Sequence, residues 1–236
     1  MEFIHHYKSL IEKPISLKES RYTTICMGFS AHMVQACMST AQLNCPITPF
    51  AALAALFWVS LSKVKGLKNG LVDMSICLDM RKVLGLDIGF FGNCMVYNKV
   101  HEVEGDNYKL KFPQAVRAIS DVVAKMDSEG VMDLIEWLEN DDVNSPTLMN
   151  GHNLVCASLE GVDPYLSVFE DGFKPIHVSC YVEPVLGEGQ VLILPGPPGE
   201  GPLSRVAMVT LREEEAIKLC EDELISQFSP TNLMKC

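Results

Sequence analysis

The histidines are considered first, because an imidazole is the usual general base of group-transfer enzymes near neutral pH. The chain contains six of them. His177 lies in an alternating apolar and polar stretch, so an extended strand would place Ser179 and Tyr181 on its face. A serine two positions along a strand does not by itself make a nucleophile–base pair, so His177 is only a weak catalytic candidate. The other histidines show no partner pattern: His5, His6, His32, His101 and His152.

Two further patterns could bind phosphate. The first is a set of basic residues, namely Lys63, Lys65, Lys68, Arg81 and Lys82. It could face a phosphorylated cofactor, although a solvated helix end is the simpler interpretation. The second is a pair of glycine turns, residues 187–190 and 195–202, which resemble phosphate loops in composition only. A phosphate loop leads into a helix, whereas a strand follows each of these turns, so hairpin connections are the favoured interpretation.

Asp79 and Arg81 are separated by one residue, so a regular strand would place both side chains on one face, where they could pair. A partly buried pair of this kind is usually structural, because a buried charge without its partner is costly. The turn that follows is Phe-Phe-Gly-Asn. We expect Phe90 and Phe91 to be core anchors, Gly92 to adopt an unusual backbone angle and Asn93 to form local hydrogen bonds.

Composition limits the function classes. The 236 residues are 48% hydrophobic and 21% charged, which predicts a packed core, and the net charge of -11 argues against nucleic-acid binding. Nine cysteines form no CxxC pair or zinc spacing, so we expect no metal and a reducing compartment. The longest apolar run, Pro49–Leu61, is shorter than the roughly 20 residues of a membrane span. A cytoplasmic location is expected, with attachment to a membrane surface through a partner left open.

Hydrophobic patterning predicts an α/β fold with a mixed sheet, because helices and strands alternate without strict βαβ regularity. Ser30 and Thr48 are expected helix N-caps. Strands are expected over residues 21–30, 70–80, 93–100, 153–158, 175–184, 190–194 and 204–211. Helices are expected over residues 31–43, 49–64, 112–126, 131–138 and 212–228.

Several segments, in this order, resemble the C-terminal half of the plant BAHD acyl-CoA-dependent acyltransferases. They are a helix starting Thr-Pro-Phe with ALAALFW, a strand ending Asp-Met-Arg, the turn FFGN, a helix pair, a Lys-Pro turn, and the strands GQVLIL and VAMVTL before an acidic helix. The resemblance runs from about residue 22 to 228. It implies a chloramphenicol-acetyltransferase-like mixed sheet with flanking helices, one half of a two-domain fold. Residues 1–21 would then be a crossover segment, and residues 22–236 the C-terminal domain.

The same resemblance implies a chemistry and shows two departures from it. A histidine in the family's HxxxD motif, in the N-terminal half, acts as general base on the hydroxyl or amine that attacks acyl-CoA. None of the six histidines here has Asp four residues later. The family's DFGWG motif precedes Lys-Pro, but no identity survives at the corresponding positions: Phe169, Glu170, Asp171, Gly172 and Phe173. We expect the turn itself to persist. The resemblance also implies that five residues line the channel or have a structural role: Asp79, Arg81, Phe91, Gly92 and Asn93.

Loss of DFGWG, together with ICLDMRKVLGLDIGFFGNCMVYNKV and EGPLSRVAMVTL, looks most like the ECERIFERUM wax-biosynthesis branch. That resemblance implies a protein without the catalytic base that assists very-long-chain fatty-acid elongation for cuticular wax. The condensing enzyme of the elongase would be its partner, at the endoplasmic reticulum surface. Acyl-CoA is a possible substrate, and no covalently bound cofactor is implied. The alternatives are an acyl-CoA-dependent O- or N-acyltransferase, transferring groups other than amino-acyl and represented by its C-terminal half, and a truncated product with little function.

The two halves of the family fold share a long interface. We therefore expect one face of this chain to be uncovered and to bind a partner or a second copy. The strand pair Gln190–Leu194 and Ser204–Leu211 is the expected carrier, as a bare sheet edge. Without the general base, we also expect the chain alone to have no acyltransferase turnover.

Overall fold

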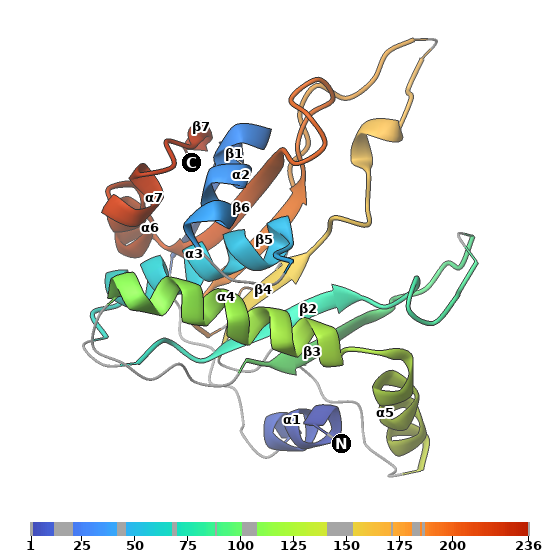
Figure 1. Cartoon of the computed structure of the whole chain (residues 1–236). Helices are drawn as coiled ribbons and strands as arrows, with labels where there is room; N and C mark the ends of the chain where they lie inside the picture. The colour runs from blue at the N-terminus through green and yellow to red at the C-terminus, as the bar shows by residue number, and fades with distance from the viewer. Residues whose placement is uncertain are drawn as a thin grey trace.

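A seven-stranded mixed sheet organises the molecule (Figure 1). The computed structural model describes residues 2–11, 21–41, 46–67, 70–87, 89–100, 108–140, 153–170, 172–180, 185 and 187–235. The strands are β1 (Tyr22–Phe29), β2 (Met74–Asp79), β3 (Met95–Lys99), β4 (Leu154–Ser158), β5 (Gln190–Pro195), β6 (Arg205–Arg212) and β7 (Thr231–Lys235). Their order in the sheet is β3-β2-β4-β5-β6-β1-β7. The pairs β2–β4 and β4–β5 are parallel and the other pairs are antiparallel, so the predicted mixed α/β fold is confirmed.

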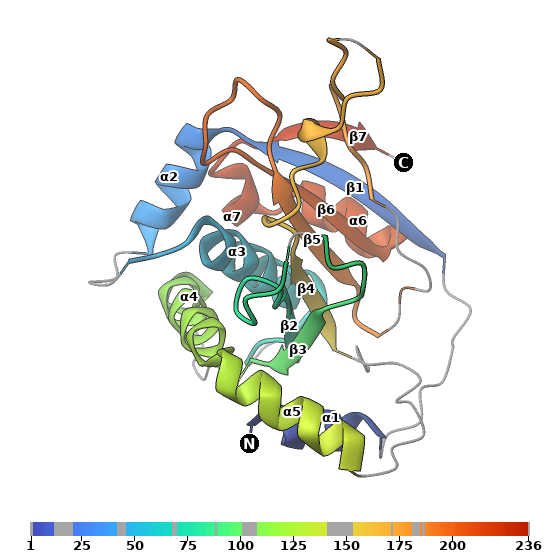
Figure 2. The same cartoon turned by 90° about the vertical axis from the view of Figure 1, so that its right-hand side faces the viewer.

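Most of the helices cover one face of this sheet. They are α1 (Glu2–Ile11), α2 (Ala31–Thr40), α3 (Pro49–Val64), α4 (Tyr108–Lys125), α5 (Ser128–Asn140), α6 (Glu213–Cys220) and α7 (Glu223–Ser226), with a 3-10 turn at Pro164–Leu166. One large hydrophobic core joins the inward residues of the sheet to α2, α3, α4, α6 and α7. Helices α1 and α5 lie together beside the edge strand β3, as Figures 1 and 2 show.

Helix α3 is the centre of the core. Its sequence is apolar on nearly every side, and every residue from Phe50 to Ser62 is buried. Thr48 caps it as predicted, since the Ala51 N–H donates to the Thr48 hydroxyl at 3.1 Å. The helix ends near Gly66, whose φ of +76° suits a residue without a Cβ.

The prediction of a bare sheet edge at residues 190–194 and 204–211 is wrong. The strands predicted to carry it are β5 and β6, and both lie inside the sheet. They pair with each other, while β4 pairs with the outer side of β5 and β1 with the outer side of β6. Among the described residues, the edges belong to β3 and β7. Part of the β3 edge is satisfied, because the Tyr97 N–H donates to the Tyr7 hydroxyl of α1 at 3.1 Å.

Two predicted elements also differ. Residues 175–180 form no strand, and residues 181–184 lie outside the described part of the chain. Alternation alone suggested a strand there, but in the described part no neighbouring strand pairs with residues 175–180. The long C-terminal helix is two short helices, because Asp222 leaves the helical conformation and caps α7. Strand β7 was not predicted.

Candidate functional site

Two long connections protrude from the same end of the sheet. One follows β2 (residues 80–94), and the other follows β4 (residues 159–180). Strands β2 and β4 are parallel neighbours, so their carboxyl ends meet at one edge and both connections leave there. Both extend to the right in Figure 1 and face the viewer in Figure 2.

Exposed apolar side chains concentrate on these connections. Fourteen large hydrophobic residues are exposed in the described part of the chain, and ten of them lie here. We call these ten the two-loop apolar surface: Val83, Leu86, Phe90, Phe91, Val162, Leu166, Val168, Phe169, Phe173 and Ile176. A concentration of this kind marks an interaction site rather than ordinary surface.

The predicted pair of Asp79 and Arg81 is present at the base of the first loop. An Arg81 Nη1 donates to Asp79 Oδ2 at 2.6 Å, and the Arg81 backbone N–H donates to Asp79 Oδ1 at 3.0 Å. The second guanidinium nitrogen donates to the Gly92 carbonyl, and the group lies 6.0 Å from the Phe90 ring centroid. Arg81 lies in the turn beyond β2, so one guanidinium ties the start of the loop to its end. Both side chains are only partly buried.

The turn at residues 90–93 departs from expectation. Phe90 and Phe91 are exposed rather than core anchors, with Phe91 wholly in solvent, because nothing in the described chain covers them. Gly92 does not have a positive φ. A Cβ there would come within 2.7 Å of the Phe90 ring, but that exposed ring could turn away, so the structure does not explain the glycine. Asn93 forms the expected local hydrogen bond, accepting the Met95 N–H at 3.0 Å.

The degenerate motif lies at the tip of the second loop. Its turn persists as predicted: the Phe173 N–H donates to the Glu170 carbonyl at 3.0 Å, and Gly172 has a φ of +88°. Phe169 and Phe173 point into solvent, so the turn has no apolar packing of its own. Asp171 lies outside the described residues.

His177 lies on the same loop and is exposed. Because residues 175–180 form no strand, the predicted shared face with Ser179 does not exist, and Tyr181 lies outside the described residues. Ser179 is also exposed. Within the described chain, no hydrogen bond or ion pair gives His177 an acid or a nucleophile as partner, so the geometry provides no catalytic constellation there.

The basic residues that the structure describes do not converge on a phosphate site. Lys65 Nζ is 2.9 Å from both Glu188 and Glu215, and Lys63 Nζ is 3.1 Å from Asp222. Arg81 is paired at the opposite end of the sheet, and Lys82 is exposed nearby. Lys68 lies outside the described residues. The glycine turn at residues 195–202 is the predicted hairpin connection, closed by the Gly196 N–H donating to the Ser204 carbonyl at 2.8 Å.

The other histidines in the described part of the chain also lack a catalytic setting. His6, a residue of α1, is buried with no hydrogen-bond partner for either ring nitrogen, and burial together with the charge of Lys99 lowers the pKa of His6 to about 4. His5 and His32 are exposed, while His101 and His152 lie outside the described residues. No three metal-ligating side chains gather within the described ranges. In that same part of the chain, no helix has both the length and the apolar character that crossing a bilayer requires.

Comparison with known proteins identifies relatives over most of the chain. No protein-family model matches it. Rosmarinate synthase of Plectranthus scutellarioides is 28% identical over 159 residues, 65% of this chain and 36% of that protein. Putrescine hydroxycinnamoyltransferase of Oryza sativa subsp. japonica is 24% identical over 185 residues, 73% of this chain and 40% of that protein. The chain thus spans well under half the length of these curated relatives.

Solved structures share the fold. The F. sporotrichioides TRI101 complex with coenzyme A and T-2 matches 92% of this chain and 52% of its own, with a TM-score of 0.67 and 18% identity. Vinorine synthase matches 90% of this chain and 49% of its own, with a TM-score of 0.64 and 18% identity. The sheet and its helices therefore have the chloramphenicol-acetyltransferase-like fold of these proteins. The two curated relatives agree with the resemblance to the BAHD acyltransferases, and the solved structures show the shared fold.

Proposed function

We propose that this BAHD acyltransferase-like chain assists the elongation of very long acyl chains for cuticular wax, without a histidine base of its own. The observation that carries the proposal is the exposed turn at the substituted DFGWG positions, where Phe169 and Phe173 face solvent and can contact a partner. Within the described chain, the exposed His177 has no acid or nucleophile beside it, which favours binding over turnover at this loop.

Acyl-CoA is the proposed ligand. The TRI101 structure is a complex with coenzyme A, and the present chain shares that fold over 92% of its length. In this proposal the chain binds or shields an acyl group while another enzyme performs the chemistry. The bonds formed and broken therefore belong to the condensing enzyme of the elongase, which is the proposed partner at the endoplasmic reticulum surface.

The two-loop apolar surface is the proposed contact with that partner. Apolar area exposed to water costs roughly 25 cal/mol for each Å². A partner that covers this surface would remove that cost for its most exposed side chains, which include Phe91, Phe169, Phe173 and Ile176. A companion half of the kind that the longer relatives contain is the other candidate occupant of this surface.

A second function is an acyl-CoA-dependent O- or N-acyltransferase of which this chain is one part. The curated relatives favour it, because one is named as a hydroxycinnamoyltransferase and the other as rosmarinate synthase. In that case a general base must come from another segment. A transcript in which an in-frame HxxxD precedes Met1 would favour this function over the first.

The test is the acyl chain-length profile of yeast that expresses the elongase condensing enzyme with and without this chain. We expect longer acyl chains only when both are present. Phe169→Ser with Phe173→Ser should abolish the extension, whereas Ile217→Ser, at an exposed apolar position on α6, should not. An unchanged profile, combined with acceptor-dependent release of CoA by the purified chain, would overturn the proposal and support the second function.

A further inference from the structure

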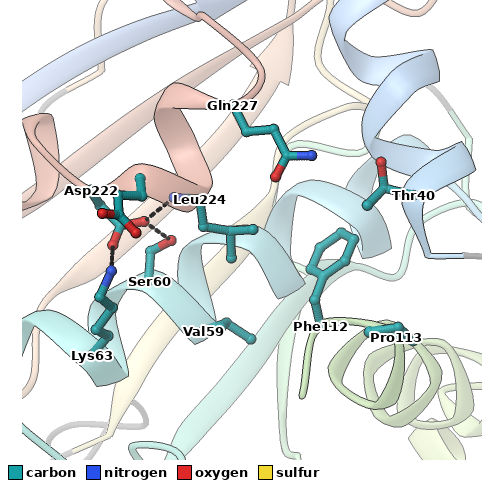
Figure 3. A pocket seen from close by; sticks show the side chains of 10 residues that line it. Thr40, Val59, Ser60, Lys63, Phe112, Pro113, Asp222, Leu224 and Gln227 are labelled. Atoms are coloured by element: carbon teal, nitrogen blue, oxygen red, sulfur yellow. Dashed lines mark hydrogen bonds and ion pairs between the residues drawn. The ribbon is translucent and has the colours of Figure 1, made fainter. Parts of the chain in front are cut away.

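A pocket of about 560 Å³ opens on the helical side of the molecule, between the end of α2, the second half of α3, the start of α4, and α7 (Figure 3). Its volume is within the range of small-molecule sites. It lies away from the two loops, and it plays no part in the function proposed above.

The middle of the pocket is apolar and its two ends are polar. Val59, Phe112, Pro113 and Leu224 line the middle, and aromatic and aliphatic walls of this kind receive an apolar ligand body. Figure 3 shows Lys63, Ser60 and Asp222 gathered at one end and the side chains of Gln227 and Thr40 at the other.

The first polar end is satisfied by the protein itself. Asp222 Oδ1 accepts the Ser60 hydroxyl at 2.8 Å and the N–H groups of Leu224 and Ile225 at 3.1 and 3.2 Å. Its Oδ2 lies 3.1 Å from Lys63 Nζ. The Asp222 carboxylate is buried, both of its oxygens have partners in the protein, and its charge neutralises that of Lys63. This end therefore offers little to an anionic ligand.

The groups that remain at the other end include two hydrogen-bond acceptors. The Thr40 hydroxyl already donates to the Ala36 carbonyl at 2.8 Å, so it has only lone pairs to offer a ligand. Gln227 is exposed, and its amide can turn its oxygen towards a donor, although its NH₂ group could equally donate. Glu223 adds an exposed carboxylate to the lining, so the charged residues of the pocket are one cation and two anions. A ligand that donates hydrogen bonds and carries positive charge fits this set.

We propose that this pocket binds a primary ammonium group attached to an aromatic or aliphatic body. The body lies against Leu224 and Phe112, while the ammonium donates to Thr40 and Gln227, and the Glu223 carboxylate adds negative charge to the same lining. No bond is made or broken in this binding, and nothing besides the amine is required.

The test uses 2-phenylethylamine as probe, titrated into the full chain and followed by backbone NMR shifts. Two isosteres with the same ring, 3-phenylpropionate and 2-phenylethanol, are compared with it. We expect the amine to bind at least 10-fold more tightly than the carboxylate, with shifts centred on Val59 and Leu224. Thr40→Val and Glu223→Gln should each weaken binding by about 3- to 5-fold. Glu136→Gln, at an exposed position on α5, is the matched control and should leave the affinity unchanged.

Three outcomes would overturn the proposal. The first is a carboxylate that binds as well as the amine. The second is a set of amine-induced shifts that lies elsewhere, or no binding at millimolar concentration. The third is an affinity that neither pocket variant changes while both variants keep the dispersed spectrum of the folded parent.

Discussion

Replacing Asp222 by alanine removes a buried carboxylate that joins α3 to α7. Loss of the N-cap of α7 costs about 1 kcal/mol. The buried Ser60 hydroxyl would lose its acceptor, which costs about 1–3 kcal/mol. The pair with Lys63 adds less than about 1 kcal/mol, because the lysine side chain is 46% exposed. The expected decrease in the free energy of unfolding is therefore about 3 kcal/mol.

Thermal unfolding followed by calorimetry or circular dichroism measures this loss. For a chain of this size each kcal/mol lowers Tm by roughly 2–4 °C, so Asp222→Ala should unfold roughly 6–12 °C earlier. The double variant with Ser60→Ala has no orphaned hydroxyl and should lose about 1–2 kcal/mol less than the sum of the single variants. Strict additivity, or a single variant within about 1 kcal/mol of the parent, would refute the idea that this carboxylate stabilises the junction.

Three further outcomes are expected. Arg81→Ala should lower the free energy of unfolding by about 1–2 kcal/mol, less than the 3–5 kcal/mol expected for a fully buried pair, because Arg81 and Asp79 are partly exposed. Denaturant unfolding measures this loss. A variant as stable as the parent would show that the guanidinium does not hold the loop. Burial lowers the pKa of His6 to about 4 from its ordinary 6.5, so the unfolded chain takes up this proton first as pH falls. The contribution of His6 to the free energy of unfolding should be constant above pH 6.5 and fall by roughly 2–3 kcal/mol towards pH 4. His6→Phe should remove that decline. Identical pH profiles of the two proteins would contradict the lowered pKa of His6. Purified chain mixed with acyl-CoAs and alcohol or amine acceptors should release no CoA above the protein-free rate, whereas release abolished by His177→Ala would instead make that histidine a base.

Features set by neighbouring residues could be predicted from the sequence. Thr48 followed by Pro49 specifies a helix start through one side chain and one fixed torsion, and an all-apolar helix must be buried. The Gly- and Pro-rich turn at residues 195–202 specified a hairpin for the same local reason. Asp79 and Arg81 pair across a single residue, so their spacing was informative.

Features set by distant partners could not be predicted in this way. The alternation around His177 is typical of a strand, but a strand also needs a neighbour, and no sequence window shows whether one is available. Phe91 has the composition of a core residue, yet its exposure depends on what else covers the loop. The pocket combines α2, α3, α4 and α7, so its lining is a property of tertiary packing alone.

The place of β1 in the sheet has a consequence for how the protein forms during synthesis. Tyr22 pairs with Arg212, and Gly28 with Thr231, so both neighbours of β1 are translated long after it. Until they emerge from the ribosome, Met27 and Phe29 have no strand beside them, although both are buried in the finished core. Closing so long a loop is slow, so β1 can join the sheet only late in folding, after its apolar side chains have spent time exposed.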